Sequence, residues 1–504
     1  MANPLYDTLF APHEGKTKPF LLLPDGGEVS YTAYLDTAAR LANTLRDAGL
    51  KPGDRVAVQV EKSPEALALY AAAVRSGVVF LPLNTAYTVE ELSYFIEDSG
   101  AGLVVCDPAR RELLAPVAAR LGAGLETLSA DGGGSLMERA RRMPTRFETV
   151  DRGEDDLAAL LYTSGTTGRS KGAMLTQRNL LSNALTLVEA WRFTEDDVLL
   201  HALPIFHTHG LFVATNVILA VGGSMIFLPK FDIDQIIANL PRATAMMGVP
   251  TFYTRLLDDP RLTRELVAHM RLFVSGSAPL LAETHRAFEE RTGHRILERY
   301  GMTETNMNTS NPYDGERRAG TVGFPLPGVE LKITDPETGE ELPRGEIGQI
   351  EVRGPNVFMG YWNMPEKTKE ELRENGFFIT GDLGLIDEDG YVHIVGRNKD
   401  LIISGGYNIY PKEIEMVLDA QPGVKESAVV GVPHPDFGET VLAVIVPEKE
   451  GRPERAALEA AVRENLARFK HPREYIFLDE LPRNTMGKVQ KNVLREKYRD
   501  LFTG

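Results

Sequence analysis

Short apolar runs alternate with amphipathic stretches along the first 300 residues of the 504-residue chain. Residues 55–60 form one such run, and Ser63 then caps a predicted helix that has Pro64 at its first position. Thr88 and Glu91 form a capping box at the start of the next helix. Further apolar runs lie at 78–83, 103–105, 157–162, 198–203, 224–228 and 271–274. Because these runs lack strict polar alternation, they predict strands covered on both faces, and hence βαβ units with mainly parallel sheet.

The pattern changes at about residue 320, where turn signals become dense, as at 335–339 and 387–390. Short strands surround these turns, and strands mixed with helices occupy the last hundred residues. We therefore predict an α/β fold whose large N-terminal domain of βαβ layers covers residues 1–398. It includes a β-rich subdomain at about 320–398. A small α+β C-terminal domain follows at 399–504, joined by a hinge.

Composition narrows the class of protein. The net charge of -16 argues against a nucleic-acid binder, which would need a basic patch. The N-terminus lacks a cationic stretch followed by an apolar core, so no secretory signal is expected. The longest apolar stretch, 211–228, is interrupted by Asn216 and Gly222 and does not resemble a membrane span. The single cysteine, Cys106, permits no internal disulfide and is expected to be a buried strand residue. We expect a soluble, cytoplasmic protein.

The loop at residues 163–172 has the composition of a phosphate cradle. It follows a predicted strand and supplies glycines for close backbone approach, hydroxyls for phosphate oxygens and one cation. It departs from the P-loop pattern of nucleotide triphosphatases, because Ser170 stands where a second glycine is required. A surface loop rich in small residues is the alternative. The predicted ATP-binding residues here are Thr163, Ser164, Gly165, Thr166, Thr167, Gly168 and Lys171.

This loop resembles the phosphate loop of the adenylate-forming superfamily, which includes acyl-CoA synthetases, luciferases and peptide synthetase adenylation domains. Four further motifs resemble those of the superfamily and occur in its order, at 300–304, 380–382, 396–400 and 482–488. The resemblance covers essentially the whole chain. It implies a ligase that activates a carboxylic acid with ATP and Mg²⁺ as an acyl-adenylate, and then transfers the acyl group to coenzyme A.

The resemblance also implies roles for individual nucleotide-binding residues. Thr303 would bond the α-phosphate, and Glu304 would hold Mg²⁺ together with Thr163, since Mg²⁺ prefers carboxylate and phosphate oxygens. Tyr300 would offer a flat face to adenine, while Asp382 and Arg397 would bond the ribose hydroxyls. The alternatives are a surface carboxylate for Glu304, a turn aspartate for Asp382 and a structural salt bridge for Arg397. The turn that would line adenine and the acyl pocket contains Ser277, Ala278 and Pro279.

The C-terminal motifs carry the two lysines of the predicted mechanism. The resemblance makes Lys488 the cation that bridges the attacking carboxylate and the α-phosphate. It makes Lys399 the hinge that rotates the small domain between the two half-reactions. Gly405 and Gly406 would lie beside the pantetheine channel of coenzyme A. Because bacterial relatives are often switched off by acetylation of this catalytic lysine, a lysine acetyltransferase acting on Lys488 is an expected partner.

Fewer residues indicate which carboxylic acid is the substrate than indicate the nucleotide. Residues 298–313 closely resemble malonyl-CoA synthetases, which join malonate, and often methylmalonate, to coenzyme A. The resemblance implies that His207, Ser277 and Arg286 contact the distal carboxylate, and His207 is also predicted to take part in catalysis. An arginine can hold a carboxylate bidentately. Met307 would limit the bulk tolerated at the α-carbon. Other arginines that could take the place of Arg286 are Arg291, Arg295 and Arg299.

Three alternatives remain at this stage. A short-chain or aryl acid–CoA ligase would have an apolar acyl pocket and a solvent-facing Arg286. An acyl-AMP transferase would donate to a carrier protein and would need a docking surface instead of a coenzyme A site. A non-catalytic nucleotide sensor would have no need for Glu304, Lys399 and Lys488 together.

Overall fold

The computed structural model describes residues 2–163, 170–404, 407–449, 451–466, 468–484 and 487–502. Five of the predicted phosphate-loop residues lie outside this part of the chain: Ser164, Gly165, Thr166, Thr167 and Gly168. The predicted coenzyme A residues Gly405 and Gly406 lie outside it as well. Among the described residues, no helix is both long and apolar enough to cross a membrane.

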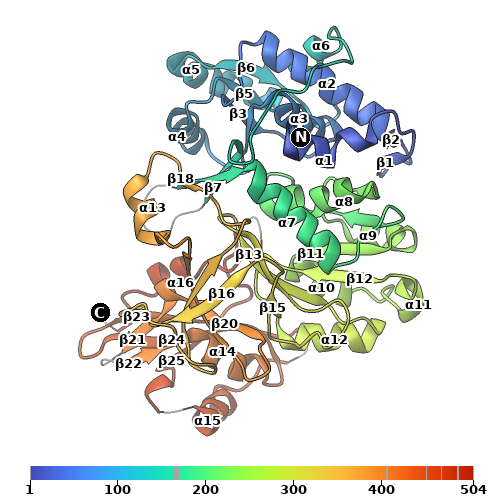
Figure 1. Cartoon of the computed structure of the whole chain (residues 1–504). Coiled ribbons are helices and arrows are strands. Elements are labelled where there is room, and N and C mark those ends of the chain that lie inside the picture. Colours follow the sequence, from blue (N-terminus) through green and yellow to red (C-terminus); the bar gives the residue numbers. More distant parts are fainter. Residues whose placement is uncertain are drawn as a thin grey trace.

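The first sheet has seven strands and lies at the top of Figure 1. Its strands, in spatial order, are β18 (Gly360–Tyr361), β8 (Lys171–Thr176), β7 (Leu157–Thr163), β4 (Val79–Pro82), β3 (Arg55–Gln59), β5 (Leu103–Cys106) and β6 (Gly124–Thr127). Its helices are α2 (Tyr31–Asp47), α3 (Pro64–Ser76), α4 (Val89–Ser99), α5 (Arg111–Leu121) and α6 (Ser135–Ala140). Ser63 caps α3, the Thr88–Glu91 capping box opens α4, and Cys106 is buried at the end of β5, all as predicted.

The second sheet has nine strands and crosses the middle of the molecule (Figure 1). Its strands, in spatial order, are β15 (Phe324–Pro325), β14 (Asn306–Ser310), β13 (Leu297–Met302), β12 (Leu272–Ser275), β11 (Ala245–Gly248), β9 (Val198–His201), β10 (Ser224–Phe227), β1 (Pro19–Leu22) and β2 (Glu28–Ser30). The adjacent pairs from β1 to β13 are parallel. The segments that follow β9, β11 and β12 therefore leave the sheet at one edge, which is where ligands bind in open α/β sheets.

Helices connect the strands of this second sheet. They are α1 (Pro4–Leu9), α7 (Gln177–Ala190), α8 (Asn216–Val221), α9 (Ile233–Asn239), α10 (Pro250–Leu257), α11 (Arg264–Val267) and α12 (Ala282–Thr292). A π-helix, η3 (His209–Thr215), leads into α8. Short 3₁₀ turns lie at Ala11–His13, Pro108–Arg110 and Leu240–Arg242. One hydrophobic core runs through most of both sheets, so the two layers form a single packed body.

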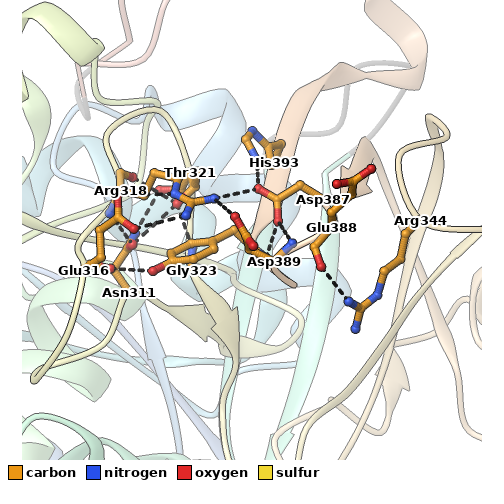
Figure 2. Close-up of polar contacts among 11 residues, drawn as sticks. Asn311, Glu316, Arg318, Thr321, Gly323, Arg344, Asp387, Glu388, Asp389 and His393 are labelled. Carbon is orange, nitrogen blue, oxygen red and sulfur yellow. Dashed lines mark hydrogen bonds and ion pairs between the residues drawn. The ribbon is translucent and has the colours of Figure 1, made fainter.

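The β-rich subdomain is an antiparallel sheet of β16 (Glu330–Thr334), β17 (Gly348–Arg353), β19 (Phe378–Ile386) and β20 (Val392–Arg397), with helix α13 (Pro365–Glu371). Figure 2 shows how it is tied to the second sheet. Arg318, in the connection from β14 to β15, pairs with Glu316 and with Asp387 and Asp389 of the β19–β20 turn. His393 Nε2 lies 2.8 Å from Asp387 Oδ2. These contacts fix the segment that follows β14.

The C-terminal elements gather at the lower left of Figure 1 around cores of their own. They comprise β21 (Ile402–Ser404), β22 (Tyr407–Ile409), β23 (Val424–His434), β24 (Gly438–Pro447), β25 (Glu474–Phe477), α14 (Pro411–Asp419), α15 (Arg455–Asn465) and α16 (Lys491–Lys497), with 3₁₀ turns at Asn398–Asp400 and Arg468–Lys470. The α/β fold with a small α+β C-terminal part is confirmed, while the domain boundary at 398–399 stays a prediction.

Candidate active site

Three predicted nucleotide residues meet beside the open edge of the second sheet. Tyr300 on β13 donates its hydroxyl proton to the Asp382 carboxylate on β19. Arg397 Nε, at the end of β20, lies 3.0 Å from Asp382 Oδ1, and that carboxylate raises the pKa of Arg397. The fold thus brings an aromatic ring, a carboxylate and a guanidinium together, a set of groups suited to binding a nucleoside. Their role in binding ATP stays a prediction.

Glu304 lies with Thr303 in the turn between β13 and β14 and is 5% exposed. Burial raises the pKa of its carboxyl group, and the Tyr361 hydroxyl lies 3.0 Å from Glu304 Oε1. No group of three or more metal-ligating side chains exists among the described residues. A single carboxylate still fits Mg²⁺, because Mg²⁺ is usually held by one or two carboxylates together with substrate phosphates and water.

Lys171 is linked to Glu304 through two residues that the sequence analysis did not identify. Its Nζ lies 3.2 Å from Glu371 Oε1 on α13 and 4.3 Å from the centre of the Tyr361 ring. The Tyr361 hydroxyl is 2.7 Å from Glu371 Oε2. Thr163, at the end of β7, donates its hydroxyl proton to the Lys171 carbonyl oxygen at 3.4 Å. Both ends of the phosphate loop are therefore adjacent to Glu304.

Lys488 reaches the same region from the C-terminal part of the chain. Its backbone N–H donates to Asn484 Oδ1 at 2.9 Å, which forms a tight turn. A Cβ placed on the preceding Gly487 would lie 3.3 Å from Thr251 Oγ1, so this turn packs against the first turn of α10. Burial and the charge of Arg397 lower the pKa of Lys488 to about 8. The pKa of Lys399 is lowered for the same two reasons. The charges of Arg397 and Asp382 therefore both act on the Lys488 amine.

The loop after β9 carries two neutral histidines. The His209 backbone N–H donates to His207 Nδ1 at 3.4 Å, which leaves the ring proton of His207 on Nε2. Burial, with the charges of Arg299 and Lys488, lowers the pKa of His207 to about 4. His209 is buried, and its Nδ1 lies 3.2 Å from Ser277 Oγ. Ser277 has a φ of +72°, a strained conformation for a residue with a side chain, which is typical of functional sites.

Arg299 on β13 is the residue of this group that the sequence analysis left among the alternatives. It is 3% exposed, and its Nε and Nη2 atoms have no hydrogen-bond partner. A Cβ placed on Gly276 would lie 2.1 Å from Arg299 Cζ, so the guanidinium rests directly on the Gly276 backbone. Burial lowers the pKa of Arg299 to about 9, which keeps it cationic at neutral pH. No carboxylate of the described chain forms an ion pair with it.

Arg286 does not join this group. It lies on α12, is 64% exposed at its side chain, and pairs with Glu283 Oε1 at 2.8 Å. The buried face of α12 is formed by Thr284, His285, Phe288 and Thr292, so helical periodicity turns Arg286 toward solvent. The predicted contact between Arg286 and the distal carboxylate stays a prediction.

The remaining predicted residues lie near the same edge of the second sheet. Met307 is buried on β14, and Asn183 of α7 bonds both its N–H (3.2 Å) and its carbonyl oxygen (3.0 Å). A Cβ on Gly301 would lie 2.4 Å from Met307 Cε, so the methionine packs against β13 two residues beyond Arg299. Ala278 and Pro279 continue the turn that begins at Gly276. Whether Met307 limits substrate bulk stays a prediction.

Family models match most of this fold. The model described as AMP-binding enzyme covers residues 11–362, and the AMP-binding enzyme C-terminal domain covers residues 413–488. The chain belongs to the AMP-binding enzyme family. This membership confirms the predicted resemblance to adenylate-forming enzymes and the predicted class, an acid–thiol ligase. AMP-binding enzymes that ligate acids to coenzyme A use ATP, Mg²⁺ and coenzyme A, as predicted.

Two curated relatives of this AMP-binding enzyme are similar over most of its length. A feruloyl-CoA synthase of Amycolatopsis sp is 37% identical over 481 residues, which cover 94% of each chain. A malonate–CoA ligase of Arabidopsis thaliana is 36% identical over 481 residues, which cover 89% of this chain and 78% of the relative. These near-equal identities do not separate an aryl acid from a dicarboxylic acid.

Solved structures of MatB from Rhodopseudomonas palustris are more similar. The ATP-bound form is 63% identical, covers 99% of both chains and superposes with a TM-score of 0.97. The apo form is 62% identical, covers 100% of both chains and superposes with a TM-score of 0.87. The arrangement of this AMP-binding enzyme, with Lys488 beside Arg397, therefore resembles the ATP-bound form more than the apo form.

The lowered pKa of Lys488 predicts an alkaline limit to the first half-reaction. Its pKa falls from the ordinary 10.5 to about 8, so Lys488 is charged below pH 8 and neutral above it. We expect kcat/KM for acid-dependent exchange between pyrophosphate and ATP, without coenzyme A, to fall about tenfold per pH unit above that value. The Lys488→Ala variant should lack this decline. A profile of the parent protein that stays flat to pH 10 would contradict the prediction.

Proposed function

We propose that the protein is an ATP-dependent malonate–CoA ligase that forms malonyl-AMP and then malonyl-CoA, with release of pyrophosphate and AMP. The buried guanidinium of Arg299 carries this proposal. Both Arg299 and Lys488 lie close enough to His207 to lower its pKa. We infer that a small acid bound beside His207 would have Lys488 at its reacting end and Arg299 at its far end.

The far-end cation favours an acid with two carboxylates. A buried cation without a partner is unfavourable, and a bound carboxylate offsets that cost best through two parallel N–H donors. Arg299 has two such donors, Nε and Nη2, without partners. Ser277 and His209 lie alongside and add neutral hydrogen-bonding groups. An apolar acyl chain would leave the guanidinium buried and unpaired, which argues against the short-chain and aryl alternatives.

The first half-reaction follows from the groups around Lys488. The reacting carboxylate attacks the α-phosphorus of ATP, and pyrophosphate leaves on the opposite side. Lys488 and Thr303 would donate to the oxygens on which negative charge develops, with the phosphate loop around the β- and γ-phosphates. Bound Mg²⁺, held by Glu304 with Thr163 nearby, would supply neutralisation of the phosphate charge. His207, with its proton on Nε2, would donate to the acid and orient it.

The second half-reaction needs different groups in the same space. A turn at Lys399 would carry Lys488 away and would bring Gly405 and Gly406 beside the adenylate. The coenzyme A thiol then attacks the malonyl-AMP carbonyl, and AMP leaves. Transfer to a carrier protein is the alternative for this step and would show as activity that does not require coenzyme A.

A substrate panel tests the proposal. AMP formation would be measured with ATP, Mg²⁺ and coenzyme A for malonate, methylmalonate, acetate and benzoate. We expect kcat/KM for malonate to exceed that for acetate and benzoate by at least about a hundredfold, because both monoacids leave Arg299 unpaired. Methylmalonate should be accepted if Met307 tolerates the extra methyl group. Benzoate or acetate turnover above malonate would refute the malonate assignment and leave the ligase class intact.

Two further parts of the proposal concern the cell. A cytoplasmic location suits a chain with one buried cysteine and an acidic net charge. A lysine acetyltransferase would switch off the enzyme at Lys488, because acetylation removes the charge required for adenylation.

A further inference from the structure

Lys62 lies behind the histidine loop, residues 203–210 with His207 and His209, and has no place in the mechanism above. It lies between β3 and α3 of the first sheet, and its Nζ reaches across to β9 of the second. There it is 2.8 Å from His201 Nδ1, 3.0 Å from the His201 carbonyl oxygen and 2.9 Å from the Leu203 carbonyl oxygen. It also lies 4.4 Å from the centre of the Phe227 ring. The Lys62 amine thus meets three acceptors and an aromatic face, and burial lowers its pKa well below the ordinary value.

His201 extends this contact to the other end of the loop. Because its Nδ1 accepts from Lys62, its Nε2 carries the proton and donates to the Gly210 carbonyl oxygen at 2.8 Å. The Thr215 hydroxyl donates to the same oxygen at 2.8 Å. The loop is tightly closed, since a Cβ on Gly210 would lie 2.0 Å from the Pro204 carbonyl oxygen. Lys62 and His201 together therefore hold both ends of residues 203–210, the segment that carries His207 and His209.

We propose that Lys62 is a positioning residue for the distal carboxylate of the acid and acts through His201 on the histidine loop. This inference rests on the proposed malonate activity. The loop is the wall of the site that faces Arg299, and its side chains must hold their hydrogen-bond geometry for a small anion to bind. A shift of the loop would weaken binding of the acid more than binding of ATP, whose predicted residues lie on other elements.

The test is Lys62→Met, which keeps the length of the side chain and removes its N–H donors. Lys18→Met is the matched control, because Lys18 is also partly exposed and donates to two backbone carbonyl oxygens, those of Glu195 and Gly222, at a distance from the site. Acid-dependent ATP–pyrophosphate exchange would be measured for both. We expect KM for malonate to rise about tenfold or more in Lys62→Met, with KM for ATP within about twofold. Lys18→Met should leave both values unchanged.

Two further variants separate positioning from general stability. His201→Phe should reproduce the rise in KM for malonate, and the double variant with Lys62→Met should be no worse than either single variant, because both break the same chain of contacts. Lys62→Gln, which retains two donors, provides the measurement if Lys62→Met does not fold, and should show a smaller rise.

Three results would overturn the inference. One is an unchanged KM for malonate in folded Lys62→Met or Lys62→Gln. Another is an equal rise in KM for ATP and malonate. The third is a rise in KM for malonate in the double variant that equals the product of the rises in the two single variants. If the parent protein itself does not use malonate, the proposed function fails instead, and the panel of acids shows this before any variant is made.

Discussion

Replacing Arg299 by methionine is expected to lower kcat/KM for malonate by about a thousandfold. Truncating one partner of a buried, hydrogen-bonded charge pair costs about 2–5 kcal/mol, which spans roughly 30-fold to several thousandfold. The expected loss lies toward the upper end of this range because Arg299 is 3% exposed and its Nε and Nη2 have no hydrogen-bond partner. The lost interaction is with the acid, so KM for ATP should stay close to the parent value. AMP formation at varied malonate and ATP measures both.

Arg286→Met is the matched control for this experiment. Arg286 is an exposed arginine paired with Glu283, and exposed pairs contribute about 0–1 kcal/mol. We expect its kcat/KM for malonate to remain within about threefold of the parent protein. A collapse in Arg286→Met with little change in Arg299→Met would reverse the assignment and restore the contact first inferred from resemblance. A loss of acetate activity equal to the loss of malonate activity in Arg299→Met would show that Arg299 is needed only for folding.

Lys488→Ala is expected to slow the first half-reaction and to leave the second nearly unchanged. Removing one preorganised donor from a developing charge costs about 10²–10³ in rate, and Lys488 carries a full charge. Acid-dependent ATP–pyrophosphate exchange should therefore fall by at least about a hundredfold. Formation of malonyl-CoA from supplied malonyl-AMP should continue near the parent rate, because Lys488 is predicted to leave the site before that step.

Lys497→Ala is the control for the Lys488 experiment. Lys497 lies on the same small domain, is exposed, and stands over the Tyr498 ring at 5.2 Å. Its exchange rate should match that of the parent protein. An equal loss of both half-reactions in Lys488→Ala would indicate damage to the small domain and would contradict the assigned role. Incubation with an acetyltransferase offers a parallel test, since acetylated protein should lose exchange alone.

The fold was largely predictable because its signals are local. Ser63 before Pro64 and Thr88 before Glu91 mark helix starts through bonds within one turn, and the structure has both caps. Apolar runs such as 157–162 became strands buried on both faces. The nucleotide residues were recognisable for a related reason, since each lies in a short contiguous motif. Tyr300, Asp382 and Arg397 come from three motifs and contact one another in the structure, while their role in binding ATP stays a prediction.

The residues proposed to bind or position the acid are harder to predict because they depend on contacts between distant segments. Arg286 was implied by the resemblance, and the face that it occupies depends on which residues of α12 pack inward. Arg299 lies in a strand and owes its environment to Gly276, which is far away in the sequence. Lys62 and His201 are separated by more than a hundred residues, and Lys62 lies after a strand of the first sheet while His201 lies in a strand of the second. The periodicity of a single segment does not predict such contacts between distant residues.

Because Gly276 packs closely on Arg299, the residue at position 276 and the residue at position 299 restrict each other in related proteins. The space that a methyl group would need at position 276 is filled by the guanidinium carbon, with only 2.1 Å between them. A side chain at 276 would force the Arg299 guanidinium to move or residue 299 to be shorter, and loss of the arginine would leave room for alanine or serine at 276. We therefore expect homologues that carry a side chain at 276 to hold residue 299 in another conformation or to have a smaller residue there.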